Sequence, residues 1–427
     1  MLSFLIPYLR LLKQKFPLIY SAFDGVVGVF VTKWMGTYPR VMGDEIGAVS
    51  AVLRGSGWNM AYGQGLVHER LEEKFANYIG AKNAVAVNTG GMALQMSIRA
   101  LGLKPGDEVV LQVDTCSATA FAVLNAGCIP KFSDISDQSF MLSIEGLDEV
   151  VTQNTKAIIA THMWGNPERM DAILEYCKKR DIAMIEDACL ALGSRTSLGM
   201  AGIGGNVGVF SFGCLKPIQG GEGGMIVTDD DSLAREMRSL RHWGDRTIEY
   251  GVRDTTQLAW NGRMSEIVAA VVAEQLKAYP RHLSLLREAV SEFQHFLHRF
   301  DGLELVLGGE GNLRDCAFTQ IVLKIDEVKL GLTKNEFRKG LDRRGLATWH
   351  GNFELINSLS FFRDNHWQDW IHKGDTASAQ LNYQGSFPVA QGVFESMGVG
   401  VPKINYLSKT RLKNLMRDVE SLMMKRY

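Results

Sequence analysis

Two charged residues, Lys216 and Asp187, stand where apolar segments end. Lys216 follows the apolar residues 209–212 and precedes a glycine-rich turn at 220–224, whereas Asp187 closes the apolar run 183–186. A lysine amine can form a Schiff base with an aldehyde, and a carboxylate can keep a pyridine nitrogen protonated, so the pair suits pyridoxal 5'-phosphate (PLP). A single lysine beside a loop is more commonly a surface charge, so the surrounding elements must decide between the two interpretations.

A second group of residues could hold the phosphate of such a cofactor. Thr89, Gly90 and Gly91 lie between an apolar strand and a helix, where glycine lets the backbone approach closely and the first helical N–H groups bind an anion. Ser211 comes five residues before Lys216 and could donate to the same phosphate. Each feature alone has a structural explanation, since the glycines could only shape a turn and the aspartate could cap the next helix. Together they form one coherent site, in which the lysine would also move the α-proton of a substrate.

From about residue 66 the apolar pattern alternates between helix and strand. We expect strands at 84–87, 108–111, 131–134, 157–161 and 183–186, and helices at 66–79, 92–101, 118–126 and 171–178. Short apolar strands that alternate with helices predict βαβ units and a mostly parallel sheet covered on both faces. Right-handed crossovers then gather the carboxyl ends of the strands at one edge. His162, at one of these strand ends, is expected to be structural rather than catalytic.

The pattern changes beyond Pro280. We expect a long amphipathic helix at 283–300, a strand at 318–325 and helices at 334–344 and 408–424, which is typical of a smaller α+β domain. The predicted organisation is an N-terminal extension (1–35), a large PLP-binding α/β domain (36–280) and a small C-terminal α+β domain (281–427).

The N-terminal extension is unusually apolar. Its apolar runs are interrupted, as by Pro7, and are shorter than the ~18 residues of a membrane span. No cleavage site of a signal peptide follows them. We expect the extension to pack on the body of the protein or on a partner subunit, with contact to a membrane surface as the alternative.

The bulk composition argues against several classes of function. Of the 427 residues, 46% are hydrophobic and 22% are charged, and the formal net charge is -1, so no charge excess would recruit nucleic acid or acidic lipid. The six cysteines show no CxxC spacing, which predicts reduced thiols in a cytoplasmic protein and neither a disulfide framework nor a metal site.

The order of these features resembles the DegT/DnrJ/StrS family of sugar aminotransferases, which are PLP enzymes of fold type I. The resemblance covers roughly residues 36–427, and the lysine segment is its most specific part. The other matching stretches are Ser56-Gly57-Trp58-Asn59, 106–109, 118–120, 126–127, 156–159, His162-Met163-Trp164-Gly165, Glu186-Asp187-Ala188, Arg241-His242-Trp243-Gly244, Trp260-Asn261-Gly262-Arg263-Met264-Ser265 and Phe387-Pro388-Val389-Ala390. The resemblance implies a mostly parallel sheet of seven strands between helices, with the smaller C-terminal domain packed beside it.

The resemblance also implies a function in the biosynthesis of sugars or secondary metabolites. An amino acid, glutamate or glutamine, would leave its amine on PLP, and a keto group on a sugar, nucleotide sugar or cyclitol would take it up. The active sites would lie at the interface of a homodimer, where Asn261 reaches the phosphate of the other subunit's cofactor and Arg263 supports that loop. Arg246 and Arg253 could hold the carboxylate of the amino donor or a sugar phosphate, or they could be solvated loop charges.

Two positions near the cofactor depart from the family pattern. Leu190 stands three residues after Asp187, where the family usually carries Gln or His to bond the phenolic oxygen of PLP. Cys116 follows Thr115, where an aromatic side chain usually stacks on the ring, a contact worth about 0.5–1.5 kcal/mol beyond area burial. The departures keep one alternative open, another PLP reaction such as elimination or dehydration. A second alternative is a non-catalytic protein of the same fold that acts as a regulator or assembly partner through its apolar N-terminal extension. Lys216 argues against the dehydratase route, for which some relatives replace this lysine by His.

Overall fold

The structure is a computed structural model that describes residues 42–55, 66–245, 254–255, 257–308, 311–344, 348, 354–370, 383, 385–401 and 409–424. These residues lie within one compact unit, residues 42–427. The predicted N-terminal extension (1–35), the motif at 56–59, Arg246 and Arg253 lie outside the described residues.

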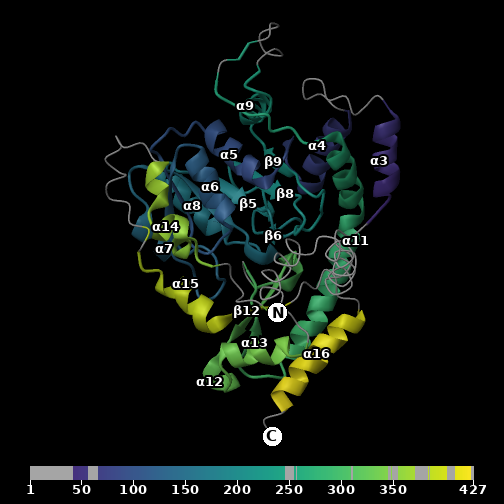
Figure 1. The fold of residues 1–427 in the computed structure, drawn as a ribbon, viewed down its shortest axis with the longest axis vertical. Coiled ribbons are helices and arrows are strands. Elements are labelled where there is room, and N and C mark those ends of the chain that lie inside the picture. Colours follow the sequence, from purple (N-terminus) through teal and green to yellow (C-terminus); the bar gives the residue numbers. More distant parts are fainter. Residues whose placement is uncertain are drawn as a thin grey trace, which may run out of the picture. The chain divides into compact units, whose positions relative to one another are not determined.

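A seven-stranded sheet forms the centre of the larger part of this unit (Figure 1). Its strand order is β1-β9-β8-β5-β4-β2-β3, and β9 runs antiparallel to both of its neighbours while the remaining pairs are parallel. The strands are β1 (Asn83–Val87), β2 (Glu108–Gln112), β3 (Ile129–Ser133), β4 (Thr155–Thr161), β5 (Ala183–Asp187), β8 (Val207–Ser211) and β9 (Gly224–Thr228). The predicted α/β class with a mostly parallel sheet is thereby confirmed.

Helices cover both faces of this sheet, as Figure 1 shows. They are α4 (Leu66–Ile79), α5 (Gly90–Ala100), α6 (Ser117–Asn125), α7 (Ile144–Val150), α8 (Met170–Arg180) and α9 (Asp231–Arg241). Successive side chains of a strand point to opposite faces. In β1, accordingly, Ala84 and Ala86 join an apolar core with α4, whereas Val85 and Val87 join a second core with α5. The hairpin β6 (Arg195–Thr196) and β7 (Gly199–Met200) lies outside the sheet.

The C-terminal elements build a second, smaller layer. The antiparallel sheet β10 (Leu303–Leu305), β11 (Ile321–Ile325) and β12 (Gly398–Val401) is accompanied by α12 (Glu327–Leu330), α13 (Lys334–Asp342) and α16 (Lys409–Met424). The short helices α14 (Ser360–Arg363) and α15 (Pro388–Gly392) complete the order of elements. No helix among the described residues is long and apolar enough to cross a membrane.

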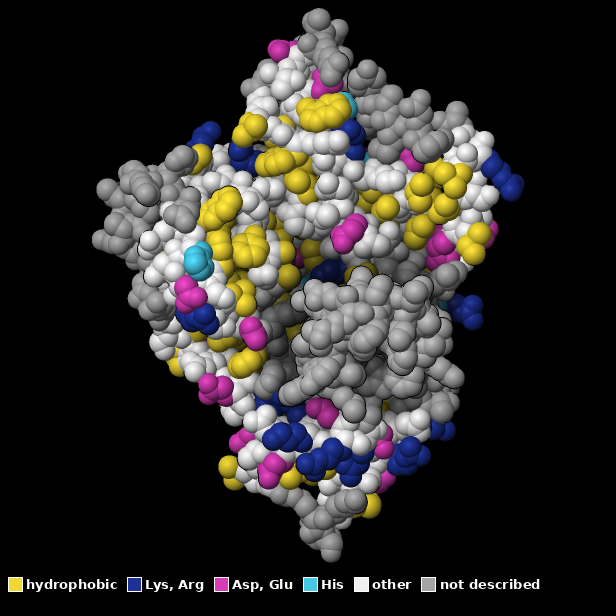
Figure 2. All heavy atoms as spheres, in the orientation of Figure 1, with side chains coloured by type: hydrophobic (Ala, Val, Ile, Leu, Met, Phe, Trp, Pro, Cys, Tyr) yellow, Lys and Arg dark blue, Asp and Glu magenta, His cyan; other side chains and the backbone are white. Residues whose placement is uncertain are grey.

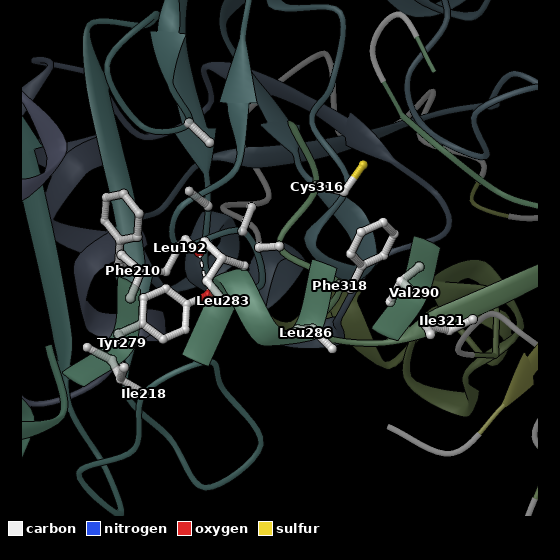
Figure 3. Close-up of a cluster of buried hydrophobic side chains, with 14 of the residues drawn as sticks. Leu192, Phe210, Ile218, Tyr279, Leu283, Leu286, Val290, Cys316, Phe318 and Ile321 are labelled. Atoms are coloured by element: carbon white, nitrogen blue, oxygen red, sulfur yellow. Dashed lines mark hydrogen bonds between the residues drawn. The ribbon is translucent and has the colours of Figure 1, made fainter. Parts of the chain in front are cut away.

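One long helix, α11 (Glu266–Leu297), runs from the larger sheet to the smaller one, and α3 (Glu45–Arg54) packs against it. The helix predicted at 283–300 therefore begins earlier, because Pro280 lies inside it without ending it. A proline removes one helical hydrogen bond, and the burial of Tyr279, Leu283 and Leu286 on either side of it outweighs that loss (Figure 3). The strand predicted from residue 318 begins only at Ile321. The domain boundaries at 35 and 280 stay predictions.

The aromatic contact between α4 and β8 generates a prediction for stability. Phe75 is fully buried, and its ring centroid lies 5.0 Å from that of Phe210 and 5.7 Å from that of Phe212, both edge to face. We expect Phe75→Ala to lower the free energy of unfolding by about 3–5 kcal/mol, because it leaves a cavity behind the strand that leads to Lys216. Phe75→Leu, which keeps most of the volume, should cost less than about 1.5 kcal/mol. Denaturant unfolding measures both, and equal midpoints for the two variants would contradict the assignment.

Candidate active site

The sequence-predicted residues converge at the edge where the parallel strands end. Asp187 is the last residue of β5, and Ser211 is the last residue of the neighbouring strand β8. β1 leads into Thr89, and Thr89 bridges to Gly223, next to the first residue of β9. Strand order alone therefore gathers the segments that carry the predicted site.

The start of α5 is pressed against the end of β8. The Thr89 hydroxyl caps α5 by accepting the N–H of Met92 at 3.0 Å, and the first N–H groups of a helix have no partner within it. A Cβ atom on Gly90 would lie 2.7 Å from the Ser211 Cβ, and one on Gly224 would lie 2.5 Å from the Thr89 carbonyl oxygen. Glycine is required at both positions, and the first N–H groups of the helix lie beside a serine, an arrangement that suits an anion and is called the cradle below.

Asp187 receives two hydrogen bonds at the strand end. The Cys189 N–H donates to Oδ1 at 3.2 Å, and the Thr119 hydroxyl of α6 donates to Oδ2 at 3.3 Å. Only 5% of Asp187 is exposed. The carboxylate is thus oriented and suited to face a protonated pyridine nitrogen.

The Cys189 thiol lies among the predicted residues. Burial raises its pKa well above the ordinary value, the Asp187 carboxylate adds to the rise, and the Lys216 ammonium opposes it. Cys116 also acts on this pKa. A Cβ on Gly90 would lie 3.1 Å from the Cys189 sulfur. Cys189 therefore lies beside Asp187, which accepts its N–H, and beside the start of α5.

Lys216 lies in a turn that is anchored to α11. Its N–H donates to the Gly213 carbonyl at 3.1 Å, and its own carbonyl accepts from the Gln219 side chain at 3.2 Å. The Gln219 N–H in turn donates to the Gln275 side chain of α11 at 2.7 Å. The Lys216 side chain itself is half-buried. These hydrogen bonds fix the backbone of the lysine turn.

His162 is structural, as expected. Its Nδ1 accepts the N–H of Glu168 at 2.8 Å, so the proton is on Nε2, which donates to Glu186 at 2.8 Å. Glu186 also accepts the N–H groups of Gly202 and Gly205, at 2.7 and 2.8 Å. This buried network faces away from Asp187 because adjacent residues of a strand point to opposite faces.

The two departures from the family pattern border the site. Cys116 is exposed at the N-cap of α6 and makes no capping hydrogen bond with its side chain. Leu190 is 9% exposed, and its carbonyl accepts a hydrogen bond from the Thr319 hydroxyl. Their contacts with the cofactor stay predictions.

Asn261 is exposed, on a segment that lies along its own subunit. Asn261 forms an isolated antiparallel β-bridge with His242. The carbonyl of the next residue, Gly262, accepts the N–H of Asn88 at 2.8 Å. Arg263 donates to His242 at 2.6 Å, and its guanidinium lies 4.3 Å from the centroid of the Trp243 ring. Arg263 thus braces this loop, whereas the reach of Asn261 toward a second subunit stays a prediction.

This donor set fits PLP. The cradle of Thr89, Gly90, Gly91 and Ser211 suits the phosphate, the Asp187 carboxylate suits the pyridine nitrogen, and Lys216 supplies an amine. In the described part of the chain, no group of three or more His, Cys, Asp or Glu residues is placed to hold a metal ion.

The fold and the site define a PLP-dependent enzyme of fold type I. The chain belongs to the DegT/DnrJ/EryC1/StrS aminotransferase family, whose model matches residues 39–380. Among solved structures, the chain is 24% identical to the aminotransferase TlmJ from Streptoalloteichus hindustanus, covering 91% of this chain and 99% of that one with a TM-score of 0.75. DesV of S. venezuelae is 25% identical, with 89% and 94% covered and a TM-score of 0.76. An E. coli GDP-4-keto-6-deoxy-D-mannose-3-dehydratase with bound hydrated PLP is 24% identical, with 91% and 98% covered and a TM-score of 0.73.

Cys189 and Thr119 are parts of the site that the sequence alone did not single out. Thr119 lies in the motif 118–120, but its hydrogen bond to Asp187 depends on how α6 crosses the sheet. Cys189 stands two residues after Asp187, and only the close approach of Gly90 reveals its central place.

The glycine pair at the start of α5 offers a matched test of the cradle. We expect Gly90→Ala to destabilise the protein and to weaken PLP binding, because the new methyl group would meet the Ser211 side chain and push the helix away. At Gly91 a Cβ would meet only the Thr89 hydroxyl, at 3.9 Å. Gly91→Ala should therefore keep the melting temperature or raise it, since alanine favours a helix by about 1 kcal/mol over glycine. Thermal unfolding and PLP titration of both apo variants measure this, and equal losses in the two would refute the close-approach argument.

Proposed function

We propose that this PLP-dependent aminotransferase moves the amine of glutamate or glutamine to a keto group on a sugar, nucleotide sugar or cyclitol. The observation that carries the proposal is the meeting of Asp187 at the end of β5, Ser211 at the end of β8 and the start of α5 at one edge of the sheet, directly before the turn that contains Lys216. The family is one of aminotransferases, and TlmJ, an aminotransferase by its name, shares the fold.

Each residue has a separate task in this reaction. Bound PLP supplies an electron sink for the carbon that loses its proton. The Lys216 amine would hold the cofactor and, once released, take a proton at Nζ from the α-carbon and return it on the cofactor side. Asp187, held by Thr119 and Cys189, would keep the pyridine nitrogen protonated. Gly90 and its neighbours at the start of α5 would anchor the phosphate.

Elimination or dehydration remains the second candidate function. The observations in its favour are the apolar Leu190 and the small Cys116 at the rim of the site, together with a dehydratase of the same fold. Lys216 favours transamination, because a lysine can carry a proton between two carbon positions. The release of ammonia or of a keto product without an acceptor would distinguish this candidate from transamination.

The absorption spectrum of the purified protein tests the proposal. Wild type should show the visible band of lysine-bound PLP, and L-glutamate or L-glutamine should convert it to the spectrum of the amine form. Borohydride reduction should fix the cofactor to the peptide that contains Lys216, as mass spectrometry would show. Lys216→Ala and Lys216→Arg should both lose the band and the transfer activity, because neither side chain can bond covalently to PLP.

The control variant separates charge from chemistry in this experiment. Lys216→Arg keeps the positive charge but cannot form the covalent bond. Activity that persists in this variant would contradict the assignment of Lys216 as the catalytic amine. A band that no amino donor changes would speak against transamination and for the second candidate.

We also propose that the protein acts as a cytoplasmic homodimer with shared active sites. Large apolar side chains are exposed near the site: Leu215, 50% exposed, precedes the lysine, and Leu258, 79% exposed, lies three residues before Asn261. Ile46 of α3 is 78% exposed. Figure 2 shows apolar side chains on the part of the surface that carries the larger sheet and its helices, while Lys and Arg gather around α13 and α16. Exposed apolar surface of this kind supports a protein–protein contact.

Mixing two inactive variants tests the shared site. If Asn261 serves the other subunit, a mixed dimer of Lys216→Ala and Asn261→Ala subunits contains one site with both residues intact. Subunit exchange at equal amounts should then restore about a quarter of the wild-type activity, since about half of the dimers are mixed and each has one good site of two. Activity that stays at the level of the separate variants, in a sample whose exchange is verified by differently tagged subunits, would place Asn261 in its own subunit's site.

A further inference from the structure

Thr161 ends β4 beside Asp187, which ends β5, and the two are register partners across parallel strands. Register partners on neighbouring strands place their side chains on the same face of a sheet. Two residues earlier on the same strands, Ile159 and Ile185 belong to the apolar core that also contains residues of α5 and α6. Thr161 therefore faces the same layer as Asp187, on the side where the phosphate cradle lies.

The Thr161 hydroxyl is buried and finds no hydrogen-bond partner among the described residues. Thr161 is 4% exposed, and its Oγ1 is unsatisfied within that part of the chain. The neighbouring Asp187 already receives its two hydrogen bonds from Cys189 and Thr119. Buried hydroxyl groups in native proteins are paired with protein, water or a ligand, so this one is expected to have a partner when the site is filled.

A polar group is missing from the neighbouring position. Leu190 brings an alkyl side chain to the place where the family usually carries Gln or His for the phenolic oxygen of PLP. His162, the next residue after Thr161, points to the opposite face of the sheet. Both nitrogens of its ring are used there, in hydrogen bonds with the Glu186 carboxylate and the Glu168 N–H. Thr161 is thus a hydroxyl without a partner, on the ring side of the sheet, next to the residue that would hold the pyridine nitrogen.

We propose that the Thr161 hydroxyl donates a hydrogen bond to the phenolic oxygen of bound PLP, in place of the polar side chain that Leu190 replaces. The proposal rests on the PLP-dependent function proposed above. A donor at this oxygen stabilises its negative charge. The nitrogen that would join Lys216 to PLP would therefore lose its proton at a lower pH. Thr161 would in this way tune the protonation of the resting cofactor.

The pH titration of the visible spectrum of the PLP-loaded, full-length protein tests the proposal. Thr161→Val is isosteric and removes only the hydroxyl, so the midpoint of the spectral change should rise by about one pH unit, the effect of one hydrogen bond. Thr161→Ser keeps the hydroxyl and should stay within a few tenths of a unit of wild type. The double variant Thr161→Val with Leu190→Gln restores the family's polar group and should bring the midpoint back toward wild type.

Thr115→Val is the matched control. Thr115 is also buried, at 1% exposed, and its hydroxyl is likewise unsatisfied within the described residues, but it follows β2, one strand further from β5. The variants leave in place Asp187 of β5, Lys216 of the turn after β8, Cys189, and Cys116 at the N-cap of α6. Because β4 separates Thr115 and its strand β2 from Asp187, Thr115→Val should leave the midpoint unchanged.

Two results would overturn the proposal. One is an unchanged midpoint in Thr161→Val, and the other is an equal shift in Thr115→Val, which would point to packing. Failure of the proposed function is a separate result, because wild-type protein would then lack a PLP spectrum that responds to an amino donor. Equal melting temperatures of the variants establish that the comparison concerns the site and not the fold.

Discussion

The close approach of two backbone segments is the constraint on which the site depends. The first residue of α5 lies against the end of β8, and the start of β9 lies against the residue that caps α5, with room for a hydrogen atom only at Gly90 and Gly224. The N–H of Phe212 also donates to the Gly223 carbonyl at 2.8 Å, which ties the two ends of the lysine turn together. The anion cradle and the lysine segment are therefore parts of one contact. A side chain at Gly90 or Gly224 would push the two backbone segments apart and disturb both the cradle and the lysine segment.

Burial imposes the second requirement, because each charged group at the sheet edge needs partners. Glu186 and Asp187 are adjacent in the chain, yet they serve opposite faces of the sheet. Glu186 is satisfied by His162 and by the N–H groups of a glycine loop, whereas Asp187 keeps two donors and remains turned toward the cradle. One carboxylate fixes the strand end, and the other is available for chemistry.

The sequence was sufficient for the parts of the fold and site that are local. Apolar runs and glycine positions predicted the parallel strands, and the residues that follow them, Ser211 and Asp187, do end β8 and β5. Contacts that depend on register could not be predicted this way: the hydrogen bond from Thr119 spans from α6 to β5, and the side-by-side placement of Thr161 and Asp187 requires the alignment of β4 and β5. Pro280 misled the prediction of helix ends, because tertiary burial outweighs its helix-breaking tendency.

The continuity of α11 gives the two sheets a common mechanical element. Near its start, Gln275 holds the turn that carries Lys216, and further along, Val290 and Phe293 share an apolar core with Ile321 and Leu323 of β11. The 32-residue helix continues through Pro280, so the turn that carries Lys216 and the smaller sheet pack against the same element. Substitutions along the buried face of α11 would therefore disturb the support of the lysine turn and the packing of the smaller sheet together, without touching Lys216 or Asp187.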